Sequence, residues 1–342
     1  MAVGHENTVY DALIIGGGPA GLSTAGHLVR GAFKVIIFDS GQYRNVHSPK
    51  FHGIPGWDSQ SPAKIREQMQ GDILNRYGEY VSIVRKEITT IENKSDGARS
   101  LFIVKDRDGS EWWRGRKVVL ATGVSDVLPS DTIPGYENCW VRGIFQCLTS
   151  QGLEQKYTAG SATPSTAGVL AAGVCAAPQL CIRLAAQAGQ LVPHVRIYTM
   201  GDTTLADQLA GMVKPAEKDR ITIENRKIAR LVCNKRGDDS AGQHSSLVTV
   251  VFEDGEETEE AFLVHKPTMQ VNGTLAKQLG LKMLPHIGHD LIHAEPPFNQ
   301  TSVPGVFAVG DCASPQKMYA QALAMGACAA AALGGQLQME DK

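Results

Sequence analysis

The sequence predicts an α/β fold of two interleaved domains, each built on a mainly parallel sheet. Three observations favour it: a glycine turn between an apolar strand and a small-residue helix at residues 10–32, a second β-α-β pattern from about residue 167, and a late strand that ends in Gly-Asp before a last helix. Units of this kind form parallel sheets of the Rossmann type. We therefore expect a two-part Rossmann-type domain with an inserted, smaller Rossmann-like domain, with boundaries at 1–127, 128–263 and 264–342.

The first domain opens with the run YDALII, an apolar strand that leads into glycines. A helix of small residues follows and ends before KVIIFDS. This stretch has the continuous apolar run of a buried parallel strand, and an acid follows the run. The next stretch is rich in Gly, Pro and Asn and is expected to be irregular. The remaining elements expected in this part are a helix at about 62–77 and strands near 80–92, 100–106 and 111–121.

The inserted domain follows a linker marked by Pro and Gly at 128–139. Its apolar runs alternate in the same β-α-β order as those of the first domain. The elements expected are strands at 167–173, 195–202, 220–232 and 247–253, a helix at 175–189, an irregular stretch at 285–304, a strand within 303–311, and a closing helix at about 317–333.

Charge and composition exclude several classes of partner. The chain of 342 residues has 33 Lys and Arg against 35 Asp and Glu, a net charge of −2 that gives no attraction for nucleic acid or an anionic membrane. We expect no secretory signal before the first strand, and no run of 18 apolar residues predicts a membrane span. The seven cysteines have no framework spacing, so we expect reduced thiols in a cytoplasmic protein.

The glycine turn fits the pattern G-x-G-x-x-G that binds a dinucleotide. Gly16 permits the tight turn, Gly18 lets a pyrophosphate approach the backbone, and Gly21 lets helix and strand pack closely. The pyrophosphate would lie at the helix N-terminus. Asp39 follows 18 residues beyond Gly21, at the end of the next strand, where a carboxylate can bind a ribose diol. The alternative is a glycine turn in a β-α-β fold that binds no nucleotide.

Three motifs together resemble the FAD-binding signature of the thioredoxin-reductase-like flavoproteins. They are GGGPAG at 16–21, LATG at 120–123 and GVFAVGDC at 305–312, and the likeness covers nearly the whole chain. The resemblance implies FAD as cofactor, with Asp311 on the ribityl chain and Gln321 near the flavin pyrimidine, although Ala320 stands where the family has Arg. The cofactor-binding residues it implies are Gly16, Gly18, Pro19, Ala20, Gly21, Asp39, Ser40, Arg44, Asn45, Ala121, Thr122, Gly123, Asp311, Gln321 and Ala322.

The second β-α-β unit departs from the family's NADPH site. Residues 169–178 contain one glycine, Gly173, where the loop needs two or three, and Asp202 stands where a 2′-phosphate would require Arg. We expect a domain of the same shape without a working nicotinamide site, and O2 as electron acceptor. In this respect the chain resembles the fungal dithiol oxidases of the gliotoxin type, which implies a secondary-metabolite pathway and a homodimer.

The redox-active C-x-x-C of that family is incomplete. The matching stretch has Cys147 at the first position, Ser150 at the second and Gln151 at the position that handles protons. A hydroxyl forms no disulfide, and an amide does not titrate near neutral pH. Cys139, eight residues upstream, could replace the missing thiol only if the fold brings it back.

Three functions remain open. In the first, an FAD-dependent oxidase acts on a small metabolite directly at the flavin, with Cys147, Ser150 and Gln151 shaping the pocket. In the second, Cys147 is a nucleophile that holds its substrate covalently, as in a dithiol oxidase. In the third, the protein binds FAD without redox turnover.

Two histidines are candidates for a general base near neutral pH, His52 in the loop that leads towards the flavin and His265 where the inserted domain ends. No metal site is expected. His286, His289 and His293 have helical spacing, but neighbouring Pro and Gly residues make a helix improbable, so we interpret them as solvated loop histidines.

Overall fold

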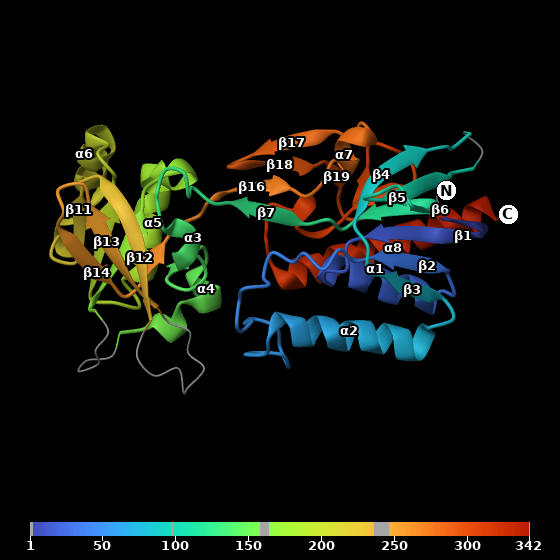
Figure 1. Ribbon diagram of the computed structural model, residues 1–342, viewed down its shortest axis with the longest axis horizontal. Helices are drawn as coiled ribbons and strands as arrows, with labels where there is room; N and C mark the ends of the chain where they lie inside the picture. The colour runs from blue at the N-terminus through green and yellow to red at the C-terminus, as the bar shows by residue number, and fades with distance from the viewer. Residues whose placement is uncertain (1–2, 97–98, 158–163, 236–245, 342) are drawn as a thin grey trace. The chain divides into compact units, whose positions relative to one another are not determined.

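The computed structural model describes residues 3–96, 99–157, 164–235 and 246–341, and the chain divides into two compact units (Figure 1). Unit 1 comprises 1–46, 54–125 and 269–342, and unit 2 comprises 47–53 and 126–268. The inserted part therefore runs from 126 to 268 rather than from 128 to 263. Unit 2 also includes the short segment 47–53, which the sequence assigned to the first domain.

Unit 1 is built on a nine-stranded sheet over the described residues. Its centre is parallel, in the order β21-β6-β1-β2-β3, and β5 and β20 add to it antiparallel. β1 begins at Val3, earlier than expected, and pairs with β6 from its first residue. The strands are β1 (Val3–Ile15), β2 (Val35–Phe38), β3 (Val81–Val84), β4 (Ile88–Asn93), β5 (Phe102–Asp106), β6 (Glu111–Leu120), β19 (Ala294–Glu295), β20 (Gln300–Thr301) and β21 (Val306–Ala308).

Alternation along the central strands divides the core of unit 1 into two layers. Ile14 and Ile37 pack against the long helices, whereas Leu13 and Ile36 pack with residues of β4, β5 and the short helix α7. Figure 1 shows these two sets of elements on opposite faces of the sheet. The helices are α1 (Pro19–Arg30), α2 (Pro62–Tyr77), α7 (Leu275–Gln278) and α8 (Tyr319–Glu340), with the 3-10 turn η5 (Gly310–Cys312) before α8.

Helix α8 is seven residues longer at its C-terminal end than the sequence indicated. It packs closely on α1, where a Cβ on Gly326 would lie 2.4 Å from the carbonyl oxygen of Ala20. Among the described helices, α8 alone has the length and apolar composition of a membrane span, and nine of its residues are buried within the protein.

Unit 2 contains a five-stranded sheet in the order β11-β10-β9-β15-β8 and a three-stranded antiparallel sheet, β12-β13-β14, over the described residues. The paired strands of the first sheet run parallel. The strands are β8 (Ile144–Phe145), β9 (Thr166–Leu170), β10 (His194–Tyr198), β11 (Ile221–Glu224), β12 (Ile228–Lys235), β13 (Ser246–Phe252), β14 (Glu257–Glu260) and β15 (Leu263–Val264). The helices and turns are α3 (Tyr136–Cys139), α4 (Leu148–Gln151), η1 (Leu153–Gln155), η2 (Gly173–Ala176), α5 (Pro178–Ala188), α6 (Thr203–Met212) and η3 (Pro215–Glu217).

The stretch 285–304, expected to be irregular, contains a β-hairpin. β17 (Met283–His286) and β18 (His289–Ile292) pair antiparallel across a two-residue turn in which Gly288 has φ +80°. Pro285 is tolerated because β17 pairs with β18 alone. Where the chain passes between the units, β7 (Val124–Val127) pairs with β16 (Thr268–Val271).

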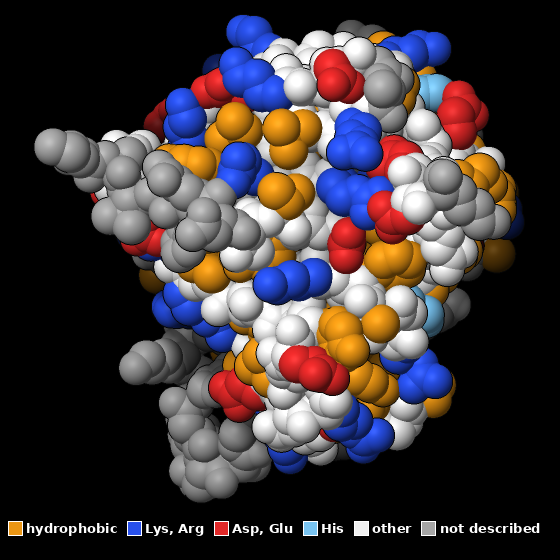
Figure 2. Space-filling model, turned by 90° about the vertical axis from the view of Figure 1, so that its right-hand side faces the viewer, with side chains coloured by type: hydrophobic (Ala, Val, Ile, Leu, Met, Phe, Trp, Pro, Cys, Tyr) orange, Lys and Arg blue, Asp and Glu red, His pale blue; other side chains and the backbone are white. Residues whose placement is uncertain are grey.

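Figure 2 shows acidic and basic side chains interspersed over one face of the molecule. Such mixing agrees with the net charge of −2. This face therefore carries no continuous basic field of the kind that attracts a polyanion.

Candidate functional site

Four motifs from distant parts of unit 1 meet at one edge of its sheet. Ile15, Phe38, Leu120 and Ala308 are the last residues of β1, β2, β6 and β21, and their pairing places them level with one another. The glycine turn, Asp39, the 121–123 run and Asp311 follow these strand ends. Ligands of open α/β sheets bind at the carboxyl ends of the strands.

The glycine turn has the geometry that a pyrophosphate requires. Gly16 has φ +123°, and a Cβ there would lie 2.1 Å from the carbonyl oxygen of Ala121. A Cβ on Gly21 would lie 2.0 Å from the Gly16 oxygen, so both positions exclude side chains by packing. Gly18 is different: it precedes α1 as its N-cap, with nothing within 4 Å of its Cβ position and no side chain capping the helix. The first N–H groups of α1 are thus open to an anion.

Asp39 is buried against this turn, its Cγ 2.3 Å from where a Cβ on Gly17 would be. Its Oδ2 accepts hydrogen bonds from Tyr43, Gln70 and Arg85. Its Oδ1 accepts from the Gly41 N–H at 3.0 Å and from no other described residue. A carboxylate oxygen has two lone pairs, so Oδ1 retains capacity for a ribose hydroxyl.

The sequence did not indicate the partners of Asp39. Arg85 follows β3 and Gln70 lies on α2, so no local spacing connects either residue to Asp39. Burial raises the pKa of Tyr43, and its hydrogen bond to Asp39 raises it further. The phenol therefore remains a hydrogen-bond donor that holds the carboxylate in place.

Asp311 lies in η5, which the positive φ of Gly310 (+76°) turns against α1. Arg44 Nη1 lies 3.4 Å from Asp311 Oδ2. Lys317 Nζ donates to the main-chain oxygens of Asp311 and Ser314, each at 2.6 Å, and so holds the turn closed. Sequence reasoning missed Lys317, because its role depends on the fold of the turn.

The other predicted cofactor-binding residues lie around the same edge. Gln321 and Ala322 are in the first turn of α8, where the helix dipole favours negative charge. Asn45 Oδ1 accepts from Arg66 at 3.2 Å, and the Thr122 carbonyl accepts from Asn272 at 2.8 Å. The further members are Pro19 and Ala20 at the start of α1, Ser40 after Asp39, and Ala121 and Gly123 after β6.

The incomplete C-x-x-C lies in unit 2 on α4. Cys147 is exposed and is the N-cap of this helix, with Ser150 Oγ 3.5 Å from its sulfur. Partial burial of the sulfur raises its pKa. Hydrogen bonds from the Ser150 hydroxyl and from the N–H groups of Ser150 and Thr149, with the charge of Lys266, outweigh that effect. The net pKa of the Cys147 thiol is lowered, which favours the thiolate.

The fold does not bring Cys139 back to Cys147. Cys139 is fully buried at the end of α3, and its thiol is hydrogen-bonded to Cys233 on β12. That contact, together with burial, raises the pKa of Cys139. Cys175 and Cys181 are likewise buried and free. Cys139 is therefore excluded as the missing relay thiol.

The segment 47–53 runs alongside α4 and η1. Gln151 Nε2 donates to Ser48 Oγ at 3.4 Å, and His52 Nε2 lies 2.9 Å from Glu154 Oε1. Four of the five predicted catalytic residues, Cys147, Ser150, Gln151 and His52, are thus gathered on or beside one short helical stretch. Glu154 was not expected from the sequence.

His265 does not join them, and the expectation of a general base there needs correction. The side chain is buried, with Nδ1 2.8 Å from the Tyr136 hydroxyl and Nε2 3.2 Å from the Ala172 carbonyl oxygen. The carbonyl can only accept, so Nε2 carries the hydrogen and Nδ1 accepts from the tyrosine. Burial lowers the pKa of His265 to about 4, although the bond to Ala172 opposes the shift. The ring is neutral at physiological pH and serves as a core hydrogen-bonding group.

His286 and His289 lie on paired strands rather than in a loop, although His286 is exposed as expected. They face each other across the β17–β18 hairpin with ring centroids 5.2 Å apart. Burial lowers the pKa of His289, and the charge of Lys317 lowers it further. Among the described residues no group of His, Cys, Asp and Glu side chains is arranged to hold a metal ion.

In the second β-α-β unit, the residues after β9 do not lead directly into the helix predicted at 175–189. Gly173–Ala176 forms the 3-10 turn η2, and α5 begins only at Pro178, which has no N–H to offer a phosphate. Asp202 caps α6 by accepting from the Leu205 N–H at 2.9 Å. The acid after the second strand thus has a structural role.

The sheet edge of unit 1 holds the residue set that FAD requires: an open helix N-terminus, a buried acid for the ribose, a second acid in η5 and a helix start for the flavin. Residues 10–329 match the family described as pyridine nucleotide-disulphide oxidoreductase. The protein is thus an FAD-binding α/β oxidoreductase. The chain belongs to the pyridine nucleotide-disulphide oxidoreductase family, in its thioredoxin-reductase-like branch.

Fungal relatives cover most of its length. The chain is 34% identical over 325 residues to thioredoxin reductase sirT of Leptosphaeria maculans, covering 94% of this chain and 92% of that one. It is 36% identical over 305 residues to thioredoxin reductase tcpT of Claviceps purpurea, covering 89% and 87%. Among solved structures, HlmI superimposes with a TM-score of 0.81 at 27% identity, covering all of this chain and 96% of that one. An oxidoreductase from Agrobacterium tumefaciens superimposes with a TM-score of 0.78 at 27% identity, covering 97% and 99%.

Proposed function

We propose that this protein is an FAD-dependent oxidase that acts on a small intermediate of fungal secondary metabolism directly at the flavin, with O2 as electron acceptor. One observation carries the proposal: the group that donates a hydrogen bond to Cys147 Sγ is the Ser150 hydroxyl, at 3.5 Å. A thiol and a hydroxyl cannot form the disulfide that passes electrons in a reductase of this branch. The substrate must then reach the flavin without that relay.

The residues of unit 1 would bind and orient the cofactor. The N–H groups at the start of α1 would hold its pyrophosphate, Asp39 a ribose hydroxyl and Asp311 the ribityl chain, with Arg44 orienting Asp311. When bound, FAD supplies a two-electron acceptor that O2 can reoxidise. The start of α8, with Gln321 in its first turn, would stabilise negative charge on the reduced ring.

The residues on α4 would shape the pocket. Ser150 and Gln151 offer hydrogen bonds, and the lowered pKa of Cys147 gives a thiolate that can bind a cationic or thiol-bearing substrate. The same lowered pKa, with the exposure of Cys147, favours a second candidate, a dithiol oxidase. In it, Cys147 and one substrate thiol would form a mixed disulfide, with bound FAD taking up the two electrons released. The second substrate thiol would then displace Cys147 and leave the substrate as a disulfide.

Two half-reactions test the proposal without knowledge of the substrate. Photoreduced holoenzyme mixed with O2 should regain its absorbance near 450 nm within seconds and release one H2O2 per FAD. Anaerobic dithiothreitol, a dithiol probe, should bleach the flavin in wild type and in Cys147→Ser at rates within about threefold. If Cys147→Ser abolishes bleaching, or mass spectrometry finds a disulfide at Cys147 during turnover, the covalent route replaces the direct one. A flavin that neither bleaches nor reoxidises indicates a protein without redox turnover.

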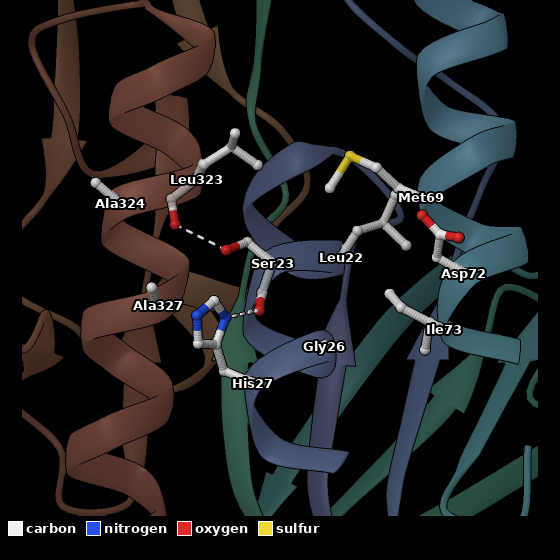
Figure 3. Close-up of a pocket in the computed structure, with 10 residues that line it drawn as sticks. All are labelled: Leu22, Ser23, Gly26, His27, Met69, Asp72, Ile73, Leu323, Ala324 and Ala327. Carbon is white, nitrogen blue, oxygen red and sulfur yellow. Dashed lines mark hydrogen bonds between the residues drawn. The ribbon is translucent and has the colours of Figure 1, made fainter. Parts of the chain in front are cut away.

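We further propose that the protein is a homodimer and that its second copy docks on a groove formed by α1, α2 and α8 (Figure 3). The groove has a volume of about 520 Å³ and is mainly apolar. Gly26 and Ala327 line it from opposite helices, so a partner helix could approach closely. Ala327→Glu should yield monomers in light scattering. A wild-type monomer at micromolar concentration would overturn this assignment.

A further inference from the structure

Two cysteines of unit 2 meet in the fold although they are far apart in the chain. Cys139 is the last residue of α3 and is fully buried, whereas Cys233 lies on β12 and is partly exposed. Side chains alternate along a strand, so Cys233 points to the same face of β12 as the buried Leu231. Cys139 and Leu231 belong to one apolar cluster, and Cys233 packs against it. The two thiols therefore lie on one face of β12.

Backbone contacts hold α3 against this part of β12. The Leu231 N–H donates to the Pro134 carbonyl oxygen at 2.8 Å. Gly135, with φ +83°, directly precedes α3, and a Cβ there would lie 2.0 Å from the Leu231 carbonyl oxygen. The turn before α3 is thus fixed to the strand two residues away from Cys233. This packing keeps the two cysteines in place for a reaction with each other.

The two thiols are also hydrogen-bonded to each other. The bond with Cys233 is the largest cause that raises the pKa of Cys139; burial raises it further, and the charge of Arg142 opposes the shift. Cys139 therefore keeps its hydrogen, and its S–H donates to the Cys233 sulfur. A donated hydrogen bond stabilises a thiolate on the sulfur that accepts it, so Cys233 is the nucleophile of the pair.

We propose that Cys139 and Cys233 form a redox-sensitive pair, which a hydroperoxide converts to a disulfide between α3 and β12. Cys233 is the partly exposed member, so a molecule as small as H2O2 meets this thiol first. The proposal does not rest on the oxidase function, although the H2O2 that such an oxidase releases is a suitable oxidant. Cys147, on α4, takes no part in the reaction.

The reaction balances with one peroxide for each pair of thiols. The Cys233 thiolate attacks one oxygen of H2O2, the O–O bond breaks, and Cys233 becomes a sulfenic acid. The hydroxide released takes up the proton that Cys233 had lost and leaves as water. The Cys139 sulfur then displaces the sulfenic hydroxyl, which takes the Cys139 hydrogen and leaves as a second water. The two thiols have lost two electrons and two protons, and the peroxide has been reduced to two waters.

The test uses the full-length holoprotein, treated with H2O2, blocked with N-ethylmaleimide in urea and digested with trypsin without reductant. Cleavage releases Cys139 in the peptide 118–142 and Cys233 in the peptide 231–235, each with a single cysteine. In wild type, mass spectrometry should find these peptides joined, two hydrogens lighter than their sum, and dithiothreitol should separate them. When H2O2 is added to protein already unfolded in urea, the joined peptides should be largely lost.

Three variants locate the reaction. Cys233→Ser should give no joined peptide, whereas Cys147→Ser should give as much of it as wild type. Cys328→Ser, which removes another partly exposed cysteine, on α8, is the matched control and should behave as wild type does. FAD content and the thermal midpoint, measured before oxidation, verify that each variant is folded.

Wild type alone can overturn the proposal, so it does not depend on whether a variant folds. The proposal is wrong if H2O2 leaves both cysteines reduced, or oxidises Cys233 to a sulfinic acid while Cys139 still takes up the maleimide. Equal yields of the joined peptides from folded and unfolded protein would also contradict it, because the packing of α3 on β12 would then contribute nothing. A link that forms in wild type but not in Cys147→Ser would assign the reaction to Cys147 instead. None of these results affects the oxidase proposal, which flavin bleaching and reoxidation test separately.

Discussion

The Ser150 hydroxyl lies 3.5 Å from the Cys147 sulfur, at the end of a short helix whose first N–H groups also point to that sulfur. The arrangement retains the activation of a redox cysteine but replaces the thiol that would complete a disulfide. A single activated thiol on α4 is consistent with a pocket residue, or with a nucleophile whose adduct has no internal thiol to resolve it.

Ser150→Ala should make the Cys147 thiol less reactive. The hydroxyl hydrogen bond lowers the pKa of this thiol, so its removal raises the pKa and leaves less thiolate at neutral pH. We expect the rate of alkylation by iodoacetamide at pH 7 to fall by ~3-fold to ~10-fold, the effect of one lost hydrogen bond to a charged group at an exposed site. Thr149→Ala removes a neighbouring exposed hydroxyl and should have no effect. Equal rates in both variants would show that Ser150 does not stabilise the thiolate.

NADPH should not reduce the flavin. The 3-10 turn at 173–176 contains one glycine, α5 starts with a proline, and the carboxylate of Asp202 would repel a 2′-phosphate. Anaerobic NADPH should leave the absorbance near 450 nm unchanged for minutes, while dithionite bleaches the same sample. Bleaching by NADPH within seconds would contradict the prediction that unit 2 has no working nicotinamide site.

Gly17→Ala should weaken FAD binding. The new Cβ would lie 2.3 Å from the Asp39 carboxylate carbon, so the acid and the glycine turn cannot both keep their positions. Tenfold weaker binding corresponds to about 1.4 kcal/mol, and we expect at least that loss when apoprotein is titrated with FAD. Gly71→Ala on α2, where the nearest atom lies at 3.9 Å, should bind FAD as wild type does. Unchanged affinity in Gly17→Ala would exclude a role for this contact.

Replacing two glycines of α8 by alanine should change the free energy of unfolding in opposite directions. Gly326→Ala would place a Cβ 2.4 Å from the Ala20 carbonyl oxygen and force α1 and α8 apart, with a loss of about 1–3 kcal/mol of unfolding free energy. Gly335 has nothing within 4 Å, so Gly335→Ala should stabilise the helix by about 0.5–1 kcal/mol. Urea unfolding of both holoproteins measures the difference. If Gly326→Ala is as stable as Gly335→Ala, then α1 and α8 can move apart without a loss of unfolding free energy.

Stability of unit 2 should depend on pH through Glu260. This carboxyl is fully buried and hydrogen-bonded to Arg196 and Tyr198. Burial raises its pKa above the ordinary value of 4.5, although Arg196 opposes the shift. The folded state therefore holds this proton more tightly than the unfolded state, so the stabilisation is present below pH 4.5 and is lost as the pH rises through the folded pKa.

The measurement is urea unfolding of wild type and Glu260→Gln from pH 4 upward. Wild type should lose unfolding free energy relative to Glu260→Gln as the pH rises, by about 1.4 kcal/mol for each unit of pKa difference. Glu259→Gln, exposed on the same strand, should follow wild type. A difference between wild type and Glu260→Gln that stays constant with pH would contradict the raised pKa.

Much of the flavin site could be predicted because its signals are local. Gly16 and Gly21 are required by the backbone turn and by the helix packing that follows within five residues. Asp39 directly follows the next strand, and parallel pairing of that strand with β1 necessarily places it beside the turn. The hairpin at 283–292 was missed because its two short strands contain Pro and His and carry no alternating apolar pattern.

The sequence by itself determined the α/β class, the dinucleotide turn and the serine that replaces the second redox cysteine, because each depends on residue type and short-range spacing. Only the tertiary structure decided that Arg85 and Gln70 hold Asp39, that His265 is a neutral core residue and that His52 pairs with Glu154. Burial and long-range hydrogen bonds depend on which distant segments pack side by side. The spacing of residues within one segment does not indicate which distant segments these are.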